Sequence, residues 1–172
     1  KWLNAHCIKA DVIIGARDKG LIILEEEMKA VAENVYIATD NGSYGFAGRA
    51  TDLLQKLVKE DGKVYNKAVI IGPMIMMKFT TMTTKELGIP TIVSLNPIMV
   101  DGTGMCGACR VTVGDEVKFA CVDGPEFDGF KVNFDEAMRR QTIYKTAEGK
   151  AKLEFEEGAT HKNGGCGCGG DK

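Results

Sequence analysis

The segment KAVIIGPMIMMKFTTMTTKELGIPTIVSLN, residues 67–96, contains a complete strand–helix–strand unit. The β-branched run of residues 67–73 ends in Gly-Pro, which stops a strand and begins a turn. Residues 74–88 follow with the composition of a helix and end at Gly88, the residue type that favours a helix C-terminus. A second β-branched run occupies residues 89–96. Because strands joined by a helix pair in parallel, this segment predicts an α/β fold.

The same alternation precedes this unit. Short β-branched runs predict strands at residues 10–16 and 35–38, and apolar residues at helical spacing predict helices at 23–33 and 49–60. Such an alternation favours a parallel sheet with helices on both faces, which binds ligands at the loops after its strands. Those loops have the sequences GARDKG, TDNGSYG and GPMIMM.

The composition limits the class of protein. A length of 172 residues suits one domain, or one domain with a small appendage, and a hydrophobic fraction of 44% is enough for a core. The net charge of -2 argues against a nucleic-acid partner, because phosphate binding needs a basic surface. The chain has neither a membrane-spanning apolar run nor a signal peptide at its start. We therefore expect a cytoplasmic protein without a membrane span.

The character of the sequence changes after Pro97. The stretch VTVGDEVKFAC predicts a hairpin around Gly114-Asp115, and residues 135–148 predict an amphipathic helix. From Gly149 the chain is polar and glycine-rich, which indicates a flexible tail, disordered from residue 157. We therefore expect an α/β domain over residues 1–97, a small domain over 98–148 and a tail over 149–172.

Three of the six cysteines are closely spaced, as Cys106-x2-Cys109-x11-Cys121. Clustered cysteines in a cytosolic protein bind metal more often than they form disulfides. The four-residue gap that precedes the C-x2-C pair of plant-type [2Fe–2S] loops leads back to Asp101, an oxygen donor that iron accepts. The glycines at positions 102, 104 and 107 would let backbone N–H groups approach the sulfur atoms of a cluster.

The spacing alone leaves other interpretations open. The same residues could form a zinc site with three thiolates and Asp101, or three free thiols, or a disulfide. Aspartate is also common in surface loops. Cys166 and Cys168 in the tail are either incidental thiols or a second, adventitious metal or redox contact.

Five stretches resemble the electron-transfer subunit family of dihydroorotate dehydrogenase. Its relatives include the sulfide dehydrogenase subunit and the small subunit of the NADH-dependent ferredoxin:NADP oxidoreductase, all within the ferredoxin–NADP reductase superfamily. The family usually has four cysteines at its cluster, but the oxidoreductase small subunits have aspartate first, as this chain has Asp101. The resemblance covers about residues 11–145. The stretches are IIGAR (13–17), ILEEEM (23–28), ATDNGSYGFAGRATDLL (38–54), VIIGPMIMMK (69–78) and DGTGMCGACRVTVGDEVKFACVDGPEFDG (101–129).

The resemblance implies a Rossmann-like NAD(P)-binding domain of ferredoxin reductase type, followed by a small [2Fe–2S] domain. The cluster ligands would be Asp101, Cys106, Cys109 and Cys121. The family's FAD-binding barrel and the first strand of its nucleotide domain have no counterpart in this sequence. We therefore expect a C-terminal fragment that lacks this first strand, is inactive by itself, and binds NAD(P)H weakly or not at all.

The expected nucleotide-binding residues follow the strands. Arg17 would pair with a phosphate or stack on adenine, and one of the acids 25–27 would face a ribose. In the family, the Gly72-Pro73 loop lies near the nicotinamide. Each loop is also compatible with an ordinary turn between strand and helix. The candidates are Gly15, Arg17, Asp40, Gly42, Gly72 and Pro73.

The resulting functional hypothesis is an oxidoreductase subunit. A hydride would pass from NAD(P)H to FAD, and single electrons would pass through the cluster to a larger flavin and iron–sulfur partner subunit in a heterodimer. No side chain needs to act as acid, base or nucleophile. One alternative is the electron-transfer subunit of dihydroorotate dehydrogenase in pyrimidine synthesis, against which Asp101 argues. The other is a zinc-stabilised binding module without enzymatic activity.

Overall fold

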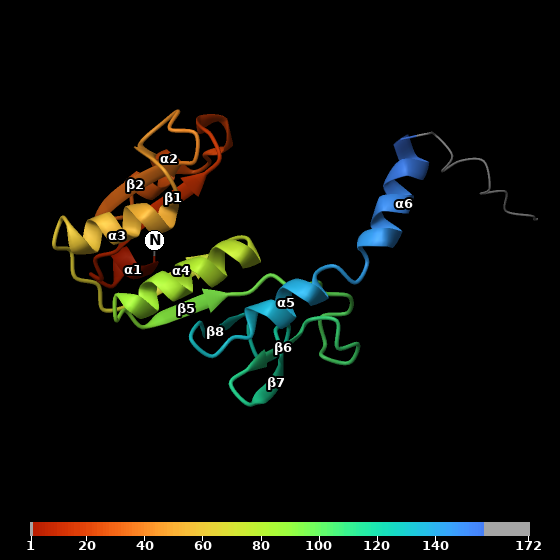
Figure 1. Cartoon of the computed structure of the whole chain (residues 1–172). Helices are drawn as coiled ribbons and strands as arrows, with labels where there is room; N and C mark the ends of the chain where they lie inside the picture. Colours follow the sequence, from red (N-terminus) through yellow and green to blue (C-terminus); the bar gives the residue numbers. More distant parts are fainter. Residues whose placement is uncertain (1, 157–172) are drawn as a thin grey trace, which may run out of the picture.

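The computed structural model describes residues 2–156, and residues 1 and 157–172 lie outside the described residues. The N-terminal half contains a three-stranded parallel sheet in the order β1-β2-β3, which α2 and α3 contact (Figure 1). A single 3-10 turn, Lys19–Leu21, follows the first strand. The elements are α1 Trp2–Ala5, β1 Asp11–Ala16, α2 Glu25–Lys29, β2 Asn34–Thr39, β3 Phe46–Ala47 and α3 Ala50–Lys59.

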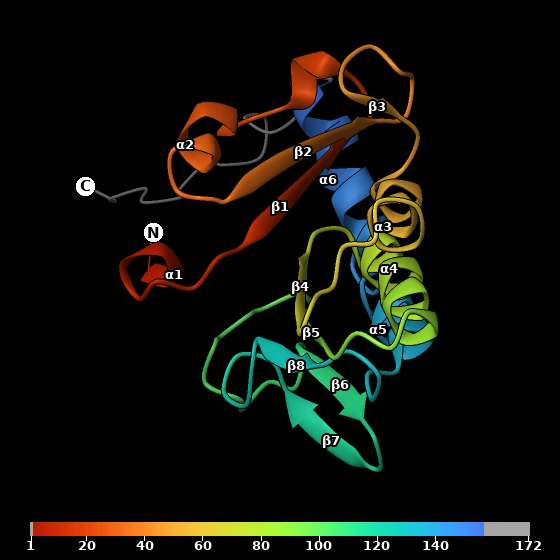
Figure 2. The same cartoon turned by 90° about the vertical axis from the view of Figure 1, so that its left-hand side faces the viewer.

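The second half contains another three-stranded sheet and a hairpin. Strand β4 pairs in parallel with β5, and β8 adds to β5 in the antiparallel direction. The hairpin of β6 and β7 extends beyond this sheet on the side away from the N-terminal half (Figure 2). The elements are β4 Ala68–Ile71, α4 Met74–Glu86, β5 Thr91–Ser94, β6 Arg110–Val113, β7 Glu116–Phe119, β8 Glu126–Asp128, α5 Phe134–Arg140 and α6 Lys145–Glu156.

The predicted α/β class with parallel strands is confirmed, but the prediction of one parallel sheet needs correction. Among the described residues, β1 pairs only with β2 and β4 pairs only with β5, so the strands form two sheets. Within residues 2–156 no strand joins β1 to β4, and the two halves meet where α3 contacts α4. The further parallel strand that the resemblance implies could pair with the unpaired edge of β1 on one side and with that of β4 on the other.

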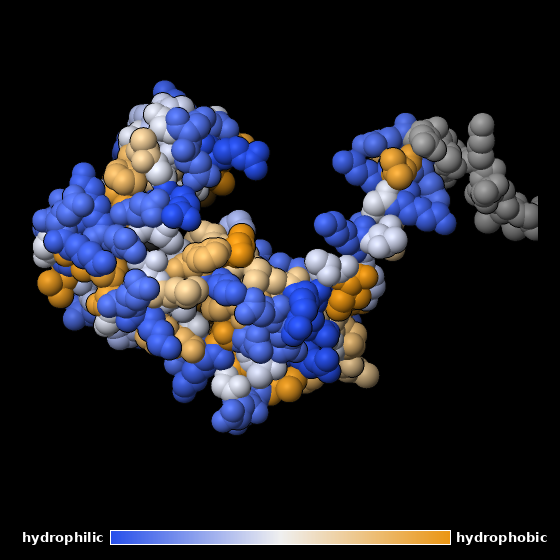
Figure 3. All heavy atoms as spheres, viewed as in Figure 1, coloured by the Kyte–Doolittle hydropathy of each residue, from blue (hydrophilic) through white to orange (hydrophobic). Residues whose placement is uncertain are grey.

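The larger core joins the second sheet to the hairpin. It is formed by Ile70, Met77 and Val93 from the sheet and α4, together with Val111 from the hairpin and Phe134 from α5. The division at residue 97 stays a prediction, and the packing adds that the parts on either side of it share this core. Figure 3 shows apolar surface over α4 and mainly polar surface over α6.

The C-terminal helix corrects two further predictions. The helix expected over residues 135–148 is two helices, because α5 ends at Arg140 and α6 begins at Lys145. Between them the Thr142 hydroxyl donates to the Arg139 carbonyl oxygen at 2.7 Å, a local bond that competes with continued helix. Regular structure then runs to Glu156, so residues 149–156 are helical where we expected the tail to begin. No helix within residues 2–156 is long and apolar enough to cross a membrane.

Asp11 anchors the first strand to its neighbours. Its side chain is 11% exposed, and its two carboxylate oxygens accept hydrogen bonds from Asn34 Nδ2 at 2.7 Å and the Tyr65 hydroxyl at 2.9 Å. Lys63 Nζ lies 3.5 Å from the second oxygen. Asp11 therefore joins β1, β2 and the segment that leads to β4.

We expect Asp11→Asn to lower the free energy of unfolding by about 1–3 kcal/mol at neutral pH, because a half-buried donor loses its acceptor. Burial by itself would raise the pKa of Asp11, but hydrogen bonds from Asn34 and Tyr65 and the charge of Lys63 hold it below its usual value. A lowered folded-state pKa stabilises the chain above the unfolded pKa of about 3.9, and this contribution is lost as the pH falls through the folded pKa. Urea unfolding of both proteins from about pH 7 down to about pH 3 measures the effect. A difference that stays constant over that range would contradict it.

Candidate metal centre

In the loop between β5 and β6, the first tight turn begins at Asp101. One carboxylate oxygen accepts a hydrogen bond from the backbone N–H of Thr103 at 2.8 Å, and the other accepts from the backbone N–H of Cys106 at 3.0 Å. Hydrogen bonds from Thr103 and then Cys106 hold the pKa of Asp101 below its usual value, so the carboxylate is ionised at neutral pH. Asp101 and Cys106 therefore form a first pair of donors.

Cys109 and Cys121 form a second pair at the base of the hairpin. Cys109 directly precedes β6 and Cys121 follows β7 after one residue, and the hydrogen bond from the Ala120 N–H to the Cys109 carbonyl oxygen closes the hairpin there. The two Sγ atoms lie 3.2 Å apart, and Cys109 is only 2% exposed. The hydrogen bond with Cys109, together with burial, raises the pKa of the Cys121 thiol. Both thiols must lose their protons to bind a metal.

Three glycines with left-handed backbone turns shape the loop that carries the donors. Gly102, Gly104 and Gly107 all have positive φ angles, of 76°, 86° and 65°, which side chains disfavour. The backbone of Gly104 partly offsets the raised pKa of the Cys121 thiol, which places the first half of the loop near the second pair. A Cβ atom at Gly104 would lie 3.0 Å from Val122 Cγ2, which shows how closely the loop approaches the hairpin.

The arrangement of the four donors can be compared with the metal sites expected from the sequence. Among the described residues, no three side chains of His, Cys, Asp or Glu converge on the position of a single metal ion. A structural zinc site needs four ligands around one ion. A cluster with two iron atoms needs two protein ligands at each, and two pairs of donors fit that requirement.

Arg140 is a contact of this loop that the sequence did not reveal. The sequence by itself suggests only a solvated helix face or a partner contact for residues 139–141. Instead, the Arg140 guanidinium donates from Nη2 to the carbonyl oxygens of Gly107 at 2.8 Å and Ala108 at 3.4 Å. The contact joins positions 33 residues apart, so no local pattern could have indicated it.

Four of the six candidate nucleotide residues lie together at the ends of β1 and β2. Gly15 is within β1, where a Cβ atom would lie 3.2 Å from Ala50 Cβ, so it allows α3 to approach the strand. Arg17 and Asp40 are exposed and follow the two strands directly, and the backbone N–H of Asp40 donates to the Ala16 carbonyl oxygen at 3.1 Å. The N–H of Gly42 closes the next turn on the Thr39 carbonyl oxygen at 3.0 Å.

The other two candidates lie on the second sheet. Gly72 and Pro73 follow β4 and line an open hollow of about 550 Å³, whose other walls include Asn96 from the end of β5 and Met138 and Gln141 from the α5 region. This hollow therefore adjoins both the expected nucleotide domain and the element that carries Arg140. The structure does not bring Gly72 and Pro73 together with the other four candidates.

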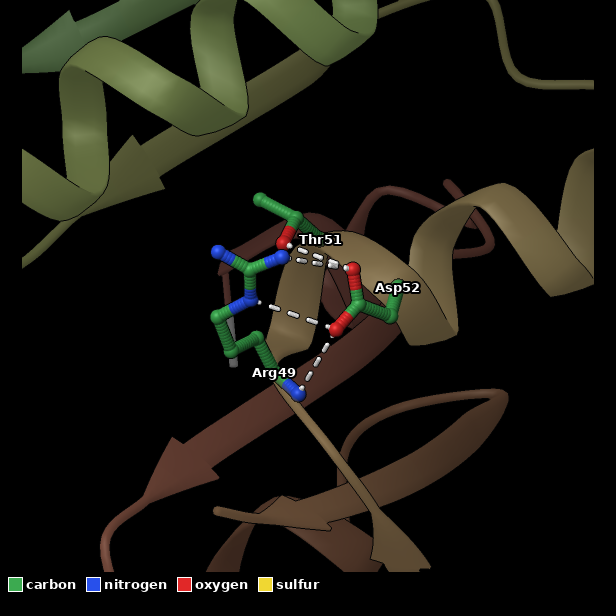
Figure 4. A network of polar contacts seen from close by, with 3 residues as sticks. All are labelled: Arg49, Thr51 and Asp52. Atoms are coloured by element: carbon green, nitrogen blue, oxygen red, sulfur yellow. Dashed lines mark hydrogen bonds and ion pairs between the residues drawn. The ribbon is translucent and has the colours of Figure 1, made fainter.

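Two carboxylates near the first group are already engaged by neighbours. Asp52 accepts from the Arg49 backbone N–H and Nε, each at 3.2 Å, and caps the start of α3 (Figure 4). The Arg49 side chain lowers the pKa of Asp52. Glu25, one of the acids considered for a ribose contact, binds Lys29 at 2.6 Å and the Tyr44 hydroxyl at 2.9 Å.

The fold and the loop together define a parallel α/β protein with a cysteine and aspartate loop suited to a metal cluster. Residues 96–133 match the iron–sulfur cluster binding domain of dihydroorotate dehydrogenase B. Relatives named as electron transfer subunits of that family are similar to this chain, as the sequence predicted.

Two relatives and one solved structure show the extent of the similarity. The whole chain is 69% identical to an uncharacterized protein of the adh 3' region in Clostridium beijerinckii, of which it covers 58%. Over 84% of the chain it is 49% identical to a homolog of the dihydroorotate dehydrogenase B (NAD(+)) electron transfer subunit in Thermotoga maritima, covering 49% of it. A chain in the structure of an NADH-dependent reduced ferredoxin-NADP oxidoreductase, solved to study flavin-based electron bifurcation, matches with TM-score 0.76 and 45% identity over 88% of this chain and 53% of that one. The chain thus spans about half the length of the curated relatives it matches.

Proposed function

We propose that this chain is the cluster-bearing part of an NAD(P)H-dependent oxidoreductase electron-transfer subunit, and that Asp101, Cys106, Cys109 and Cys121 hold a [2Fe–2S] cluster. The observation that carries the proposal is the arrangement of these four donors in two pairs, within the segment that matches an iron–sulfur binding domain. When bound, the cluster would supply one-electron transfer. The chain's own contribution is to fix the donors and to keep Cys109 away from water.

The proposed nucleotide site is supported by where its candidate residues lie in the sheet. Arg17, Asp40 and Gly42 lie at the carboxyl ends of two parallel strands, where such sheets bind ligands, and the exposed Arg17 would pair with a phosphate. Gly72 and Pro73 would face the nicotinamide. FAD would belong to a further domain, as in the resemblance, and a larger flavin and iron–sulfur subunit in the cytoplasm would take the electrons. The side chains bind and orient, and none needs to exchange a proton.

A second candidate is the electron-transfer subunit of dihydroorotate dehydrogenase B itself. The names of several relatives favour it, at 33–36% identity over about three quarters of this chain. Asp101 argues against it, because that branch of the family usually has cysteine at the first ligand position. Co-purification of the partner subunit decides between them, since only one of the two partners would reduce NAD(+) with dihydroorotate.

We expect Asp101→Ala to weaken or shift the EPR signal of the reduced protein, because one iron would lose its oxygen ligand. The measurement is anaerobic reconstitution with iron and sulfide, followed by the visible spectrum and reduced-state EPR. Asp115→Ala is the matched control, because Asp115 is an exposed aspartate in the hairpin turn. Equal spectra from wild type and Asp101→Ala would remove Asp101 from the site. A colourless wild type with stoichiometric zinc would overturn the proposed function.

A further inference from the structure

Arg140 contacts the metal loop from behind. It is the last residue of α5, and its side chain crosses to the segment between Cys106 and Cys109. Its Nη2 donates to the Gly107 carbonyl oxygen at 2.8 Å and to the Ala108 carbonyl oxygen at 3.4 Å. Its Nε is buried and has no hydrogen-bond partner among the described residues. The guanidinium is therefore committed to these two carbonyl groups.

These bonds fix the direction of two peptide planes. In a trans peptide the C=O and N–H groups point in opposite directions. The carbonyl groups of Gly107 and Ala108 face Arg140, so the N–H groups of Ala108 and Cys109 face the other way. The Ala108 N–H does reach the Cys106 sulfur, at 3.5 Å. Arg140 thus orients N–H donors toward the thiol side of the loop, where such donors tune a metal centre.

The positive charge of Arg140 also bears on the metal centre. A guanidinium stays protonated at every accessible pH, and within residues 2–156 this one forms no ion pair with a carboxylate. Its half-buried position limits screening by solvent. A redox centre gains negative charge on reduction, so a fixed positive charge behind the loop favours the reduced state.

We propose that Arg140 is a positioning residue of the metal centre, which orders the loop from Cys106 to Cys109 and raises the reduction potential of the cluster held there. The inference rests on the proposed function, because it concerns the same cluster. It assigns to α5 a role in setting the potential, in addition to its packing role.

The test compares Arg140→Met, Arg140→Lys and Arg139→Met. Arg139 is the exposed neighbour on the same helix and is the matched control. The first measurement is the midpoint potential of the reconstituted chain. The second is the rate at which Cys109 of the metal-free chain is alkylated, resolved by mass spectrometry. The second readout does not depend on a loaded cluster.

We expect Arg140→Met to lower the ratio of reduced to oxidised cluster at the wild-type midpoint about tenfold, which is about 59 mV for one electron. We expect Cys109 to be alkylated about tenfold faster in Arg140→Met, because two charge-assisted hydrogen bonds no longer hold the loop closed. Arg140→Lys keeps the charge and loses the fork of donors, so its potential should stay nearer to wild type while its alkylation rate rises. Arg139→Met should match wild type in both measurements.

Several results would overturn the inference. A wild-type potential in Arg140→Met would do so, even with faster alkylation, because the residue would then act only in packing. If circular dichroism shows that Arg140→Met does not fold, Arg140→Lys decides, and an unchanged alkylation rate there counts against the inference. A wild-type chain that takes up no iron and sulfide would instead defeat the proposed function, and the inference with it. An unchanged alkylation rate in a folded Arg140→Met defeats the inference alone.

Discussion

Replacing Cys109 by serine should remove nearly all of the visible absorbance that the wild-type chain gains on reconstitution with iron and sulfide. Cys109 is the most buried of the four proposed ligands and lies with its Sγ 3.2 Å from that of Cys121. A serine hydroxyl is a harder donor than a thiolate and is not deprotonated as easily, so one iron would have only Cys121. Because each iron of the cluster needs two protein ligands, we expect loss of the cluster and not a mere shift in its spectrum.

The control for this change is Cys7→Ser. Cys7 is exposed and lies just after α1, outside the metal loop and the core that surrounds it. Its replacement should leave the absorbance and the iron content of the reconstituted chain unchanged. A chain with Cys109→Ser that holds as much iron and sulfide as wild type would remove Cys109 from the ligand set. Loss of absorbance in both variants would indicate general misfolding instead, which circular dichroism of the metal-free proteins detects.

Much of this site was predictable because its determinants are local. The spacing of Cys106 and Cys109 in a glycine-rich loop indicates a metal, and the hairpin that returns Cys121 has a turn signal at Gly114. The ends of α4 follow in the same way from Pro73 and from Gly88, whose φ of 69° is the left-handed conformation expected there. In each case the physical cause lies within a few residues of its effect.

The features that could not be predicted depend on distant parts of the chain. Arg140 contacts the loop only because α5 packs against the hairpin. The sequence around an arginine in a helix does not indicate such a contact. The separation of the sheet into two has the same origin. The sequence pattern predicts β1 and β4 as strands, but the pairing of each depends on which backbone edge lies beside it. The break between α5 and α6 was missed because Thr142 has an ordinary place in the helical pattern.

Gly45→Ala should lower the free energy of unfolding by about 3 kcal/mol, the largest stability effect that we expect from one methyl group in this chain. Gly45 closes the loop after β2 with a φ of 69°, a conformation that costs an L-residue about 1–2 kcal/mol. The added Cβ would also overlap the carbonyl oxygen of Ile37, a backbone atom held in β2 by its pairing with β1. Both the new Cβ and the Ile37 carbonyl oxygen are attached directly to the backbone, so neither can move away as the end of a flexible side chain could. Urea unfolding followed by far-ultraviolet circular dichroism measures the loss.

Gly62→Ala separates the two causes. Gly62 has nearly the same φ, 67°, but a Cβ atom there would meet no heavy atom within 4 Å. Its replacement should therefore cost only the backbone term, about 1 kcal/mol, because the reduced freedom of the unfolded chain offsets part of the strain. Equal losses in the two variants would show that the loop after β2 relaxes away from Ile37. The loop would then be too loosely held to fix Asp40 and Gly42 beside Arg17, and the proposed nucleotide site would lose its structural basis on that strand.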